Sequence, residues 1–124
     1  MSSLITSNIS DGTTSVPTGY VVNGSAKVWS NTSQAATYAI RDSLNLSSVN
    51  DNGTGSTTFN FTSAFNSANH AVSGMASNDN NNLANAENDT TQTASLVRCE
   101  SYDVGGNYNQ DSLWTTMCVH GDLA

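Results

Sequence analysis

A five-residue stretch, Asp-Asn-Gly-Thr-Gly at positions 51–55, joins two runs in which apolar and polar side chains alternate. Asn-Gly is a dipeptide that accommodates the positive φ angles of a tight hairpin turn. The pattern therefore predicts a β-hairpin from Leu44 to Phe61, with Asn52 and Gly53 fixing its register. A chain that contains such a hairpin has to build further strands, because a single two-stranded ribbon is marginal in water.

Further runs rich in β-branched and aromatic residues recur along the chain, separated by Gly, Asn, Asp and Ser. A second hairpin is expected from Thr93 to His120, with Gly105 near its turn. This spacing predicts an all-β fold, an antiparallel, jelly-roll-like β-sandwich of about six to eight strands. The runs are AKVWS (26–30), ATYAIRDSLNLSSV (36–49), STTFNF (56–61), HAVSGMA (70–76), QTASLVRCESYDV (92–104) and SLWTTMCVH (112–120).

The composition agrees with strands that carry solvent-facing Ser, Thr and Asn. Charged residues make up 10% of the chain, against about 25% in typical domains. Disorder is disfavoured because the chain has 1 Pro, abundant Thr and recurring aromatic residues. Residues 1–24 alternate polar and isolated apolar residues around Pro17, which predicts an extended lead-in or linker before a sandwich domain at 25–124.

The formal net charge is −7, from 3 Lys and Arg against 10 Asp and Glu. Such a surface cannot neutralise a phosphate backbone, so neither nucleic acid nor an anionic membrane surface is an expected partner. No stretch approaches the ~20 apolar residues of a membrane-spanning helix, so no membrane insertion is expected. MSSLITSNIS lacks a basic segment followed by an apolar one, so no signal peptide is expected.

Aromatic side chains next to polar ones are the candidates for binding a sugar, because a ring offers a flat apolar platform. The candidates are Tyr102, Tyr108 and Asn107 between them, and Tyr108 is expected to be the better exposed. Trp29 and Trp114 are expected to be structural residues of the core. The polar loop at 77–92 is a further place for recognition, and its candidates are Asn78, Asp79, Asn80 and Asn81.

No metal site is predicted, since the spacing of the acids does not match a calcium loop, although Asp79 and Asp89 are weak calcium candidates. His70 and His120 have no partner at ligand spacing and are expected to be structural. Cys99 and Cys118 are expected to be buried thiols, with a cross-strand disulfide as the alternative.

An enzyme is not predicted. The acids that could work as a pair are scattered without diagnostic spacing, and no Gly-x-Ser-x-Gly motif singles out a nucleophile. Arg41 is one of three cations and needs a partner if it is buried in a sheet. Because the adjacent Asp42 should point to the opposite face, Arg41 is expected to brace the fold by pairing with a carboxylate on another strand or subunit. The acids considered are Asp42, Glu100, Asp103 and Asp111.

Several motifs occur in an order that resembles a known domain. They are NGSAKVW at 23–29, AIRDSLNLSSVNDNGTGSTTFNFTSAF at 39–65 and the terminal HGDLA. Together they resemble a C-terminal domain of bacteriophage tail fibre and tail structural proteins, especially those of marine and cyanobacterial phages. The resemblance extends from about Asp11 to Ala124.

The resemblance implies a virion component at the end of a tail fibre or appendage, assembled in the host cytoplasm. It implies a homotrimer that contacts other tail proteins and attaches to a glycan or protein receptor on the host surface, with no catalytic residue and no cofactor. Two alternatives stay open: a monomeric carbohydrate-binding sandwich that uses Tyr102 and Tyr108, and a depolymerase that cuts a surface glycan.

Overall fold

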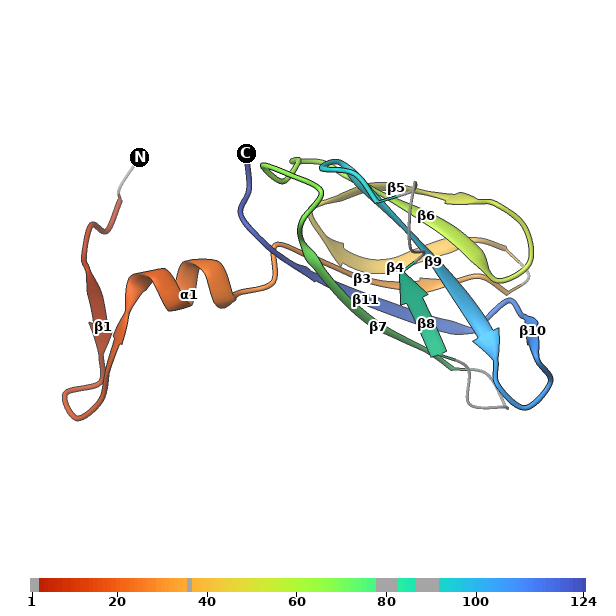
Figure 1. The fold of residues 1–124 in the computed structure, drawn as a ribbon, viewed down its shortest axis with the longest axis horizontal. Helices are drawn as coiled ribbons and strands as arrows, with labels where there is room; N and C mark the ends of the chain where they lie inside the picture. The colour runs from red at the N-terminus through yellow and green to blue at the C-terminus, as the bar shows by residue number, and fades with distance from the viewer. Residues whose placement is uncertain (1–2, 36, 78–82, 87–91) are drawn as a thin grey trace.

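The computed structural model describes residues 3–35, 37–77, 83–86 and 92–124. They form two antiparallel sheets packed face to face and an N-terminal arm beside them (Figure 1). The first sheet has the order β4 (Ala39–Leu44), β3 (Val28–Ser33), β11 (Trp114–His120), β7 (Ala71–Ser77). The second sheet follows β10 (Tyr108–Asn109), β9 (Leu96–Asp103), β6 (Ser56–Phe61), β5 (Leu46–Asp51), with β8 (Leu83–Ala86) also paired to β9.

The predicted all-β sandwich is confirmed, but the strands are more numerous than expected. The described part of the sandwich holds nine strands. One cause is that the predicted run at 36–49 is two strands that belong to different sheets. Asn45 separates them with a φ of 57°, and its side chain both accepts from Ser63 N at 2.7 Å and donates to Ser63 O at 3.1 Å. One residue in the left-handed conformation thus carries the chain from the first sheet to the second.

The hairpin of β5 and β6 is confirmed from Leu46 onward, in a register that pairs Asp51 with Thr57. Its turn differs from the prediction, because the positive φ angles lie at Gly53 (111°) and Gly55 (72°) and not at Asn52. Asn52 stabilises the turn in another way: its backbone N donates to Ser56 O at 3.0 Å, and its side chain donates to Thr58 Oγ1 at 2.8 Å.

The hairpin predicted from Thr93 to His120 is wrong. After β9 the chain returns only for the two residues of β10, through a turn that contains Gly105. It then crosses to the first sheet, where β11 lies between β3 and β7. A hydrogen bond of 2.9 Å from Gln34 N to Ser112 O lies on this crossing. Apolar residues on both faces of β11 are compatible with pairing to β9 in the second sheet and with pairing to β3 and β7 in the first. The pattern alone therefore could not assign the strand to a sheet.

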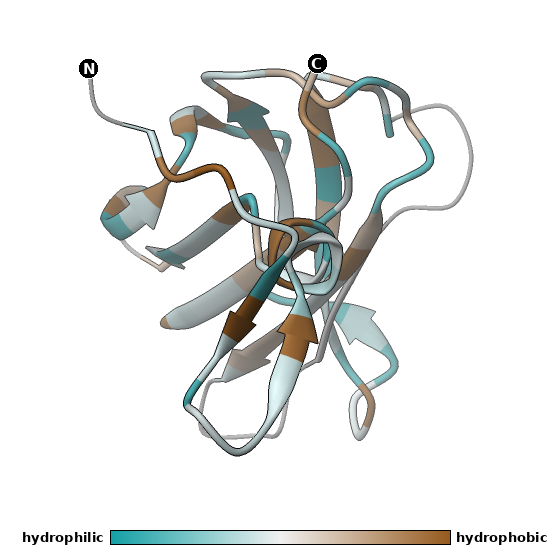
Figure 2. Cartoon of the chain, turned by 90° about the vertical axis from the view of Figure 1, so that its left-hand side faces the viewer, coloured by the Kyte–Doolittle hydropathy of each residue, from teal (hydrophilic) through white to brown (hydrophobic). Residues whose placement is uncertain are grey.

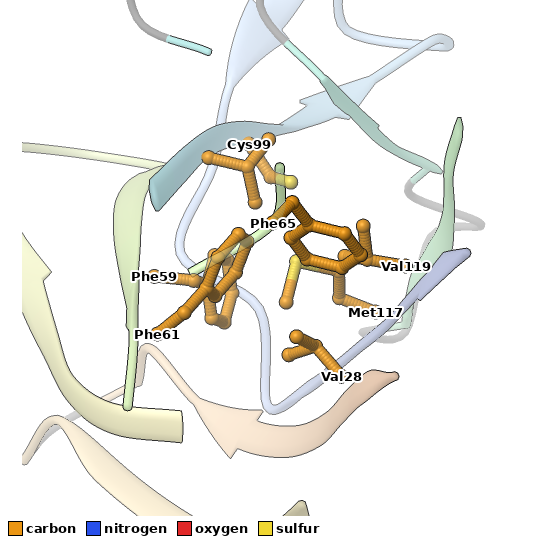
Figure 3. Close-up of a cluster of buried hydrophobic side chains, with 8 residues drawn as sticks. Val28, Phe59, Phe61, Phe65, Cys99, Met117 and Val119 are labelled. Atoms are coloured by element: carbon orange, nitrogen blue, oxygen red, sulfur yellow. The ribbon is translucent and has the colours of Figure 1, made fainter. Parts of the chain in front are cut away.

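The space between the sheets has an apolar end and a polar end. At the apolar end eight side chains form one cluster (Figure 3): Val28, Phe59, Phe61, Phe65, Val97, Cys99, Met117 and Val119. At the other end, where β3 and β9 finish and β6 begins, the buried side chains are polar: Gln34, Thr57, Ser101 and Ser112. Gln34 is their centre, since its amide bonds to Thr57, to Ser101 and to the backbone N of Ser112.

The lead-in contains more regular structure than the extended segment that its sequence predicted. It forms a hairpin of β1 (Asn8–Ser10) and β2 (Ser15–Pro17), followed by the helix α1 (Thr18–Gly24). Pro17 is the N-cap residue of this helix, with a φ of −56°, so the proline ring restricts the backbone directly before the first helical residue. This arm projects from the apolar end of the sandwich (Figure 1). Within the described residues, no helix is both long and apolar enough to cross a membrane.

Candidate functional site

The strands β9 and β10 bring Tyr102, Asn107 and Tyr108 together at the polar end of the sandwich. Tyr108 lies opposite Asp103 in the register, and Asn109 lies opposite Tyr102. The Tyr102 hydroxyl donates to Asn107 Oδ1, and Asn107 adopts a positive φ of 59°. The structure thus assembles these three predicted residues around one turn.

Asp103 holds this turn in place. Its side chain is buried, and Oδ1 accepts hydrogen bonds from Gly105 N at 2.9 Å and Gly106 N at 3.0 Å. The ring of Tyr108 packs closely against Gly106, and a Cβ at this position would displace it. The ring of Tyr108 therefore rests on the backbone of the turn and stays 51% exposed. A ring fixed in this way can stack on an apolar sugar face at little entropic cost.

The predicted loop residues Asn78, Asp79, Asn80 and Asn81, and the weak calcium candidate Asp89, lie outside the described residues. The strand that follows the first four is described, and Leu83 at its start lies opposite Tyr102 in the register. Within the described part of the chain, no group of three or more His, Cys, Asp or Glu side chains could hold a metal ion.

The four acids considered for catalysis are used separately: Asp42 lies on β4, Glu100 and Asp103 lie on β9, and Asp111 lies between β10 and β11. Asp42 accepts from its neighbour Ser43 N at 2.9 Å, Asp103 braces the β9–β10 turn, and Asp111 Oδ1 accepts from Gly55 N at 2.7 Å. Glu100 lies on β9, opposite Ser56. Three of these carboxylates therefore accept hydrogen bonds from backbone amides, which is a structural use.

His70 is buried at the apolar end, where its ring lies 4.6 Å from that of Phe65 and 5.8 Å from that of Phe61, centroid to centroid. Its Nδ1 faces Ser67 O at 3.4 Å. Nε2 is buried without a hydrogen-bond partner among the described residues. Burial lowers the pKa of His70, because the charged ring would lose its hydration.

Trp29 and Trp114 are not in the core. Both lie on the outer face of the first sheet, where Trp29 is partly buried and Trp114 is 48% exposed. Among the described residues no carboxylate pairs with Arg41, and the contact they provide is the Trp114 ring, whose centroid lies 3.5 Å from the Arg41 guanidinium carbon. Pairing of Arg41 with a carboxylate of another subunit stays a prediction. The sequence does not predict this pair, because Arg41 and Trp114 lie on strands whose order in the sheet the patterns did not determine.

Comparison with known proteins gives no match to a family model, to a curated protein or to a solved structure.

Proposed function

We propose that this chain is a structural module of a phage tail fibre or appendage, that it assembles as a homotrimer, and that it attaches the virion to the host cell surface. The observation that carries the proposal is the arm, whose large apolar side chains are exposed. Figure 2 shows the hydrophobic segments of this arm in front of the sandwich. They are Leu4, Ile5, Ile9, Val16, Tyr20, Val21 and Val22, with exposed fractions from 39% to 94%.

The arm needs a neighbour to be stable. Its helix has 7 residues and no buried side chain, and isolated helices shorter than about 12 residues are marginal in water. Its hairpin has strands of three residues, and an isolated hairpin is marginal as well. The sandwich of the same chain does not cover the arm, so another chain is the source of the missing contacts.

The distribution of apolar residues on the helix favours neighbours on more than one side. Tyr20, Val21 and Val22 are consecutive and all exposed. At about 100° per residue they span roughly 200° of the helix surface, more than one partner helix covers. A cyclic assembly with arms around a common axis gives every helix two neighbours.

Charge also favours the arm as the place of contact. Residues 1–24 contain one charged side chain, Asp11, whereas residues 25–124 contain three cations and nine acids, a net −6. Three copies together carry 3 × −7 = −21. Contact through the arms keeps the strongly negative domains apart, and the repulsion between them also keeps assembled fibres soluble.

The attachment role rests on the position of the tyrosines. The β9–β10 turn lies at the end of the sandwich remote from the arm (Figure 1). A fibre joined through the arm would therefore present Tyr102 and Tyr108 outward, toward a receptor on the host.

Light scattering on the purified chain tests the assembly, and blocking of phage adsorption tests the attachment. We expect a trimer at micromolar concentration, and a shift toward monomer when Val22→Asp places a charge on the helix. The matched control Val104→Asp adds the same charge to an exposed apolar residue of the β9–β10 turn and should leave the trimer intact.

A stable monomer at micromolar concentration would contradict the trimer, and glycan binding by that monomer would favour the carbohydrate-binding alternative. Failure of an intact trimer to reduce adsorption of the phage to its host would contradict the attachment role.

A further inference from the structure

The outer face of the first sheet carries a cation stacked on an aromatic ring. The Arg41 guanidinium carbon lies 3.5 Å from the Trp114 ring centroid. The two residues belong to β4 and β11, which are separated by β3, so the contact passes over β3. Trp114 remains 48% exposed even with the guanidinium against it.

A β-bulge directs Arg41 to this position. Asn31 on β3 pairs with Asp42, whereas the next residue, Thr32, pairs with Ile40. Arg41 is thus an extra residue without a partner in the ladder. Bulges of this kind re-aim a side chain and are over-represented beside functional sites.

The donors of Arg41 point at no acceptor within the described chain. No hydrogen bond and no ion pair is formed there by its guanidinium. The other two cations differ: Lys27 Nζ donates to Ser25 O at 3.0 Å and Ser25 Oγ at 2.8 Å, and Arg98 Nε donates to Ser56 Oγ at 2.8 Å. Arg41 is held by a ring, which fixes the guanidinium plane and leaves its N–H groups available.

We propose that Arg41 and Trp114 bind an acidic sugar of a surface glycan, with the carboxylate of the sugar on Arg41 and its apolar ring face against Trp114. A guanidinium presents N–H donors in a planar fork that matches the two oxygens of a carboxylate. The exposed part of the indole supplies the flat apolar surface on which sugar rings stack. Naming this ligand rests on the proposed attachment to a host-surface glycan.

The negative charge of the chain does not prevent such a contact. The nearest acid in sequence, Asp42, accepts a hydrogen bond from Ser43 N at 2.9 Å. More distant charges are screened beyond about 8 Å at physiological ionic strength. A glycan is favoured over an acidic peptide because the site includes the exposed ring of Trp114, which a glutamate side chain would not cover.

Calorimetric titration of the intact chain with tetragalacturonic acid tests the site. We expect binding that weakens at least about tenfold for the methyl ester of the tetramer and for the variant Arg41→Gln, because each loses a charged hydrogen-bonded pair. Arg41→Lys keeps the charge without the fork and should fall between wild type and Arg41→Gln. The matched control Lys27→Gln removes one positive charge elsewhere and should bind as wild type does.

Fluorescence locates the ligand. The chain has two tryptophans, so Trp29→Phe leaves Trp114 as the sole reporter, whose emission should change on titration with the tetramer. Circular dichroism of each variant checks that the fold is kept. Position 41 is exposed, so Arg41→Lys should fold and still tests whether the planar guanidinium is required.

Three results would overturn the site: no binding of the tetramer at millimolar concentration, equal losses in Arg41→Gln and Lys27→Gln, or equal affinity for the tetramer and a tetraglutamate peptide. These outcomes are separable from the attachment role. A protein that blocks adsorption without binding the tetramer contradicts the site alone, whereas one that binds the tetramer without blocking adsorption contradicts the attachment role.

Discussion

The Ser101 hydroxyl donates a hydrogen bond of 2.8 Å to Gln34 Oε1, which joins the second sheet to the end of the first. The same oxygen accepts from Ser112 N at 2.9 Å, and Gln34 Nε2 donates to Thr57 Oγ1 at 2.8 Å. Gln34 is 3% exposed, so none of these bonds competes with water. One amide therefore satisfies three partners at the polar end of the sandwich.

Replacing Gln34 by Leu should lower the free energy of unfolding by about 2–4 kcal/mol. The substitution removes three buried hydrogen bonds. Thr57 keeps its hydrogen bond to the Tyr38 hydroxyl, whereas a buried group left without a partner costs about 1–3 kcal/mol. Urea denaturation measures the change. Asn50→Ala, at an exposed amide of β5, is the control and should stay within about 0.5–1 kcal/mol of wild type. Equal effects of the two variants would mean that the polar end contributes nothing specific.

The turn between β5 and β6 should tolerate alanine at Gly53 better than at Gly55. Both residues have positive φ angles, so backbone strain should destabilise both variants by roughly 1 kcal/mol. A Cβ at Gly53 meets nothing within 4 Å, whereas a Cβ at Gly55 would lie 2.6 Å from Ser101 O and 2.8 Å from Gln110 N. Thermal unfolding should therefore show a clearly larger loss for Gly55→Ala, and a loss no larger than that of Gly53→Ala would refute the crowding.

Sequence patterns predicted the fold class and the alternation along β6, because alternation with period two is read directly from neighbouring residues. Thr57, Phe59 and Phe61 are buried as that pattern requires. Which sheet a strand joins was not predictable, since Asn45 and the segment before β11 look like ordinary polar residues. The alternation rule also failed at Arg41, where a bulge adds one residue to the strand.

The candidate site was predictable only in part. Tyr102, Asn107 and Tyr108 are close in sequence, so a turn between them was enough to bring them together. Arg41 and Trp114 are far apart in sequence, and their contact depends on a strand order that the patterns did not determine. The sequence also did not indicate that Gln34 is buried, because an amide side chain before a loop is normally exposed.

His70 should make the protein less stable as the pH falls below neutral. Its pKa in the folded state lies below the usual value of 6.5, because burial disfavours the charged ring. Between pH 6.5 and that lowered pKa the unfolded chain takes up a proton that the folded chain does not, so the free energy of unfolding decreases as the pH falls. The stabilisation is fully present above pH 6.5 and is lost as the pH falls through this window.

Melting temperatures between pH 5.5 and 7.5 measure this effect. His70→Phe places another ring beside Phe61 and Phe65 and should flatten the pH dependence. Val28→Ala is the control: it removes apolar volume from the same core without a titrating group, so it should lower stability at every pH and keep the slope. An unchanged slope in His70→Phe would contradict the assignment.

The two cysteines should react with iodoacetamide at very different rates. Both are thiols, and they lie on different sheets: Cys99 on β9 is 4% exposed and belongs to the core, whereas Cys118 on β11 is partly exposed on the outer face. Cys118 can therefore react in the folded protein, but Cys99 has to wait for unfolding. Labelling of Cys99 should follow the free energy of unfolding, so Gln34→Leu should accelerate it by roughly 30-fold or more and leave Cys118 unchanged. Mass spectrometry of the peptides separates the two sites, and equal acceleration at both would show that Cys118 also reacts only through unfolding.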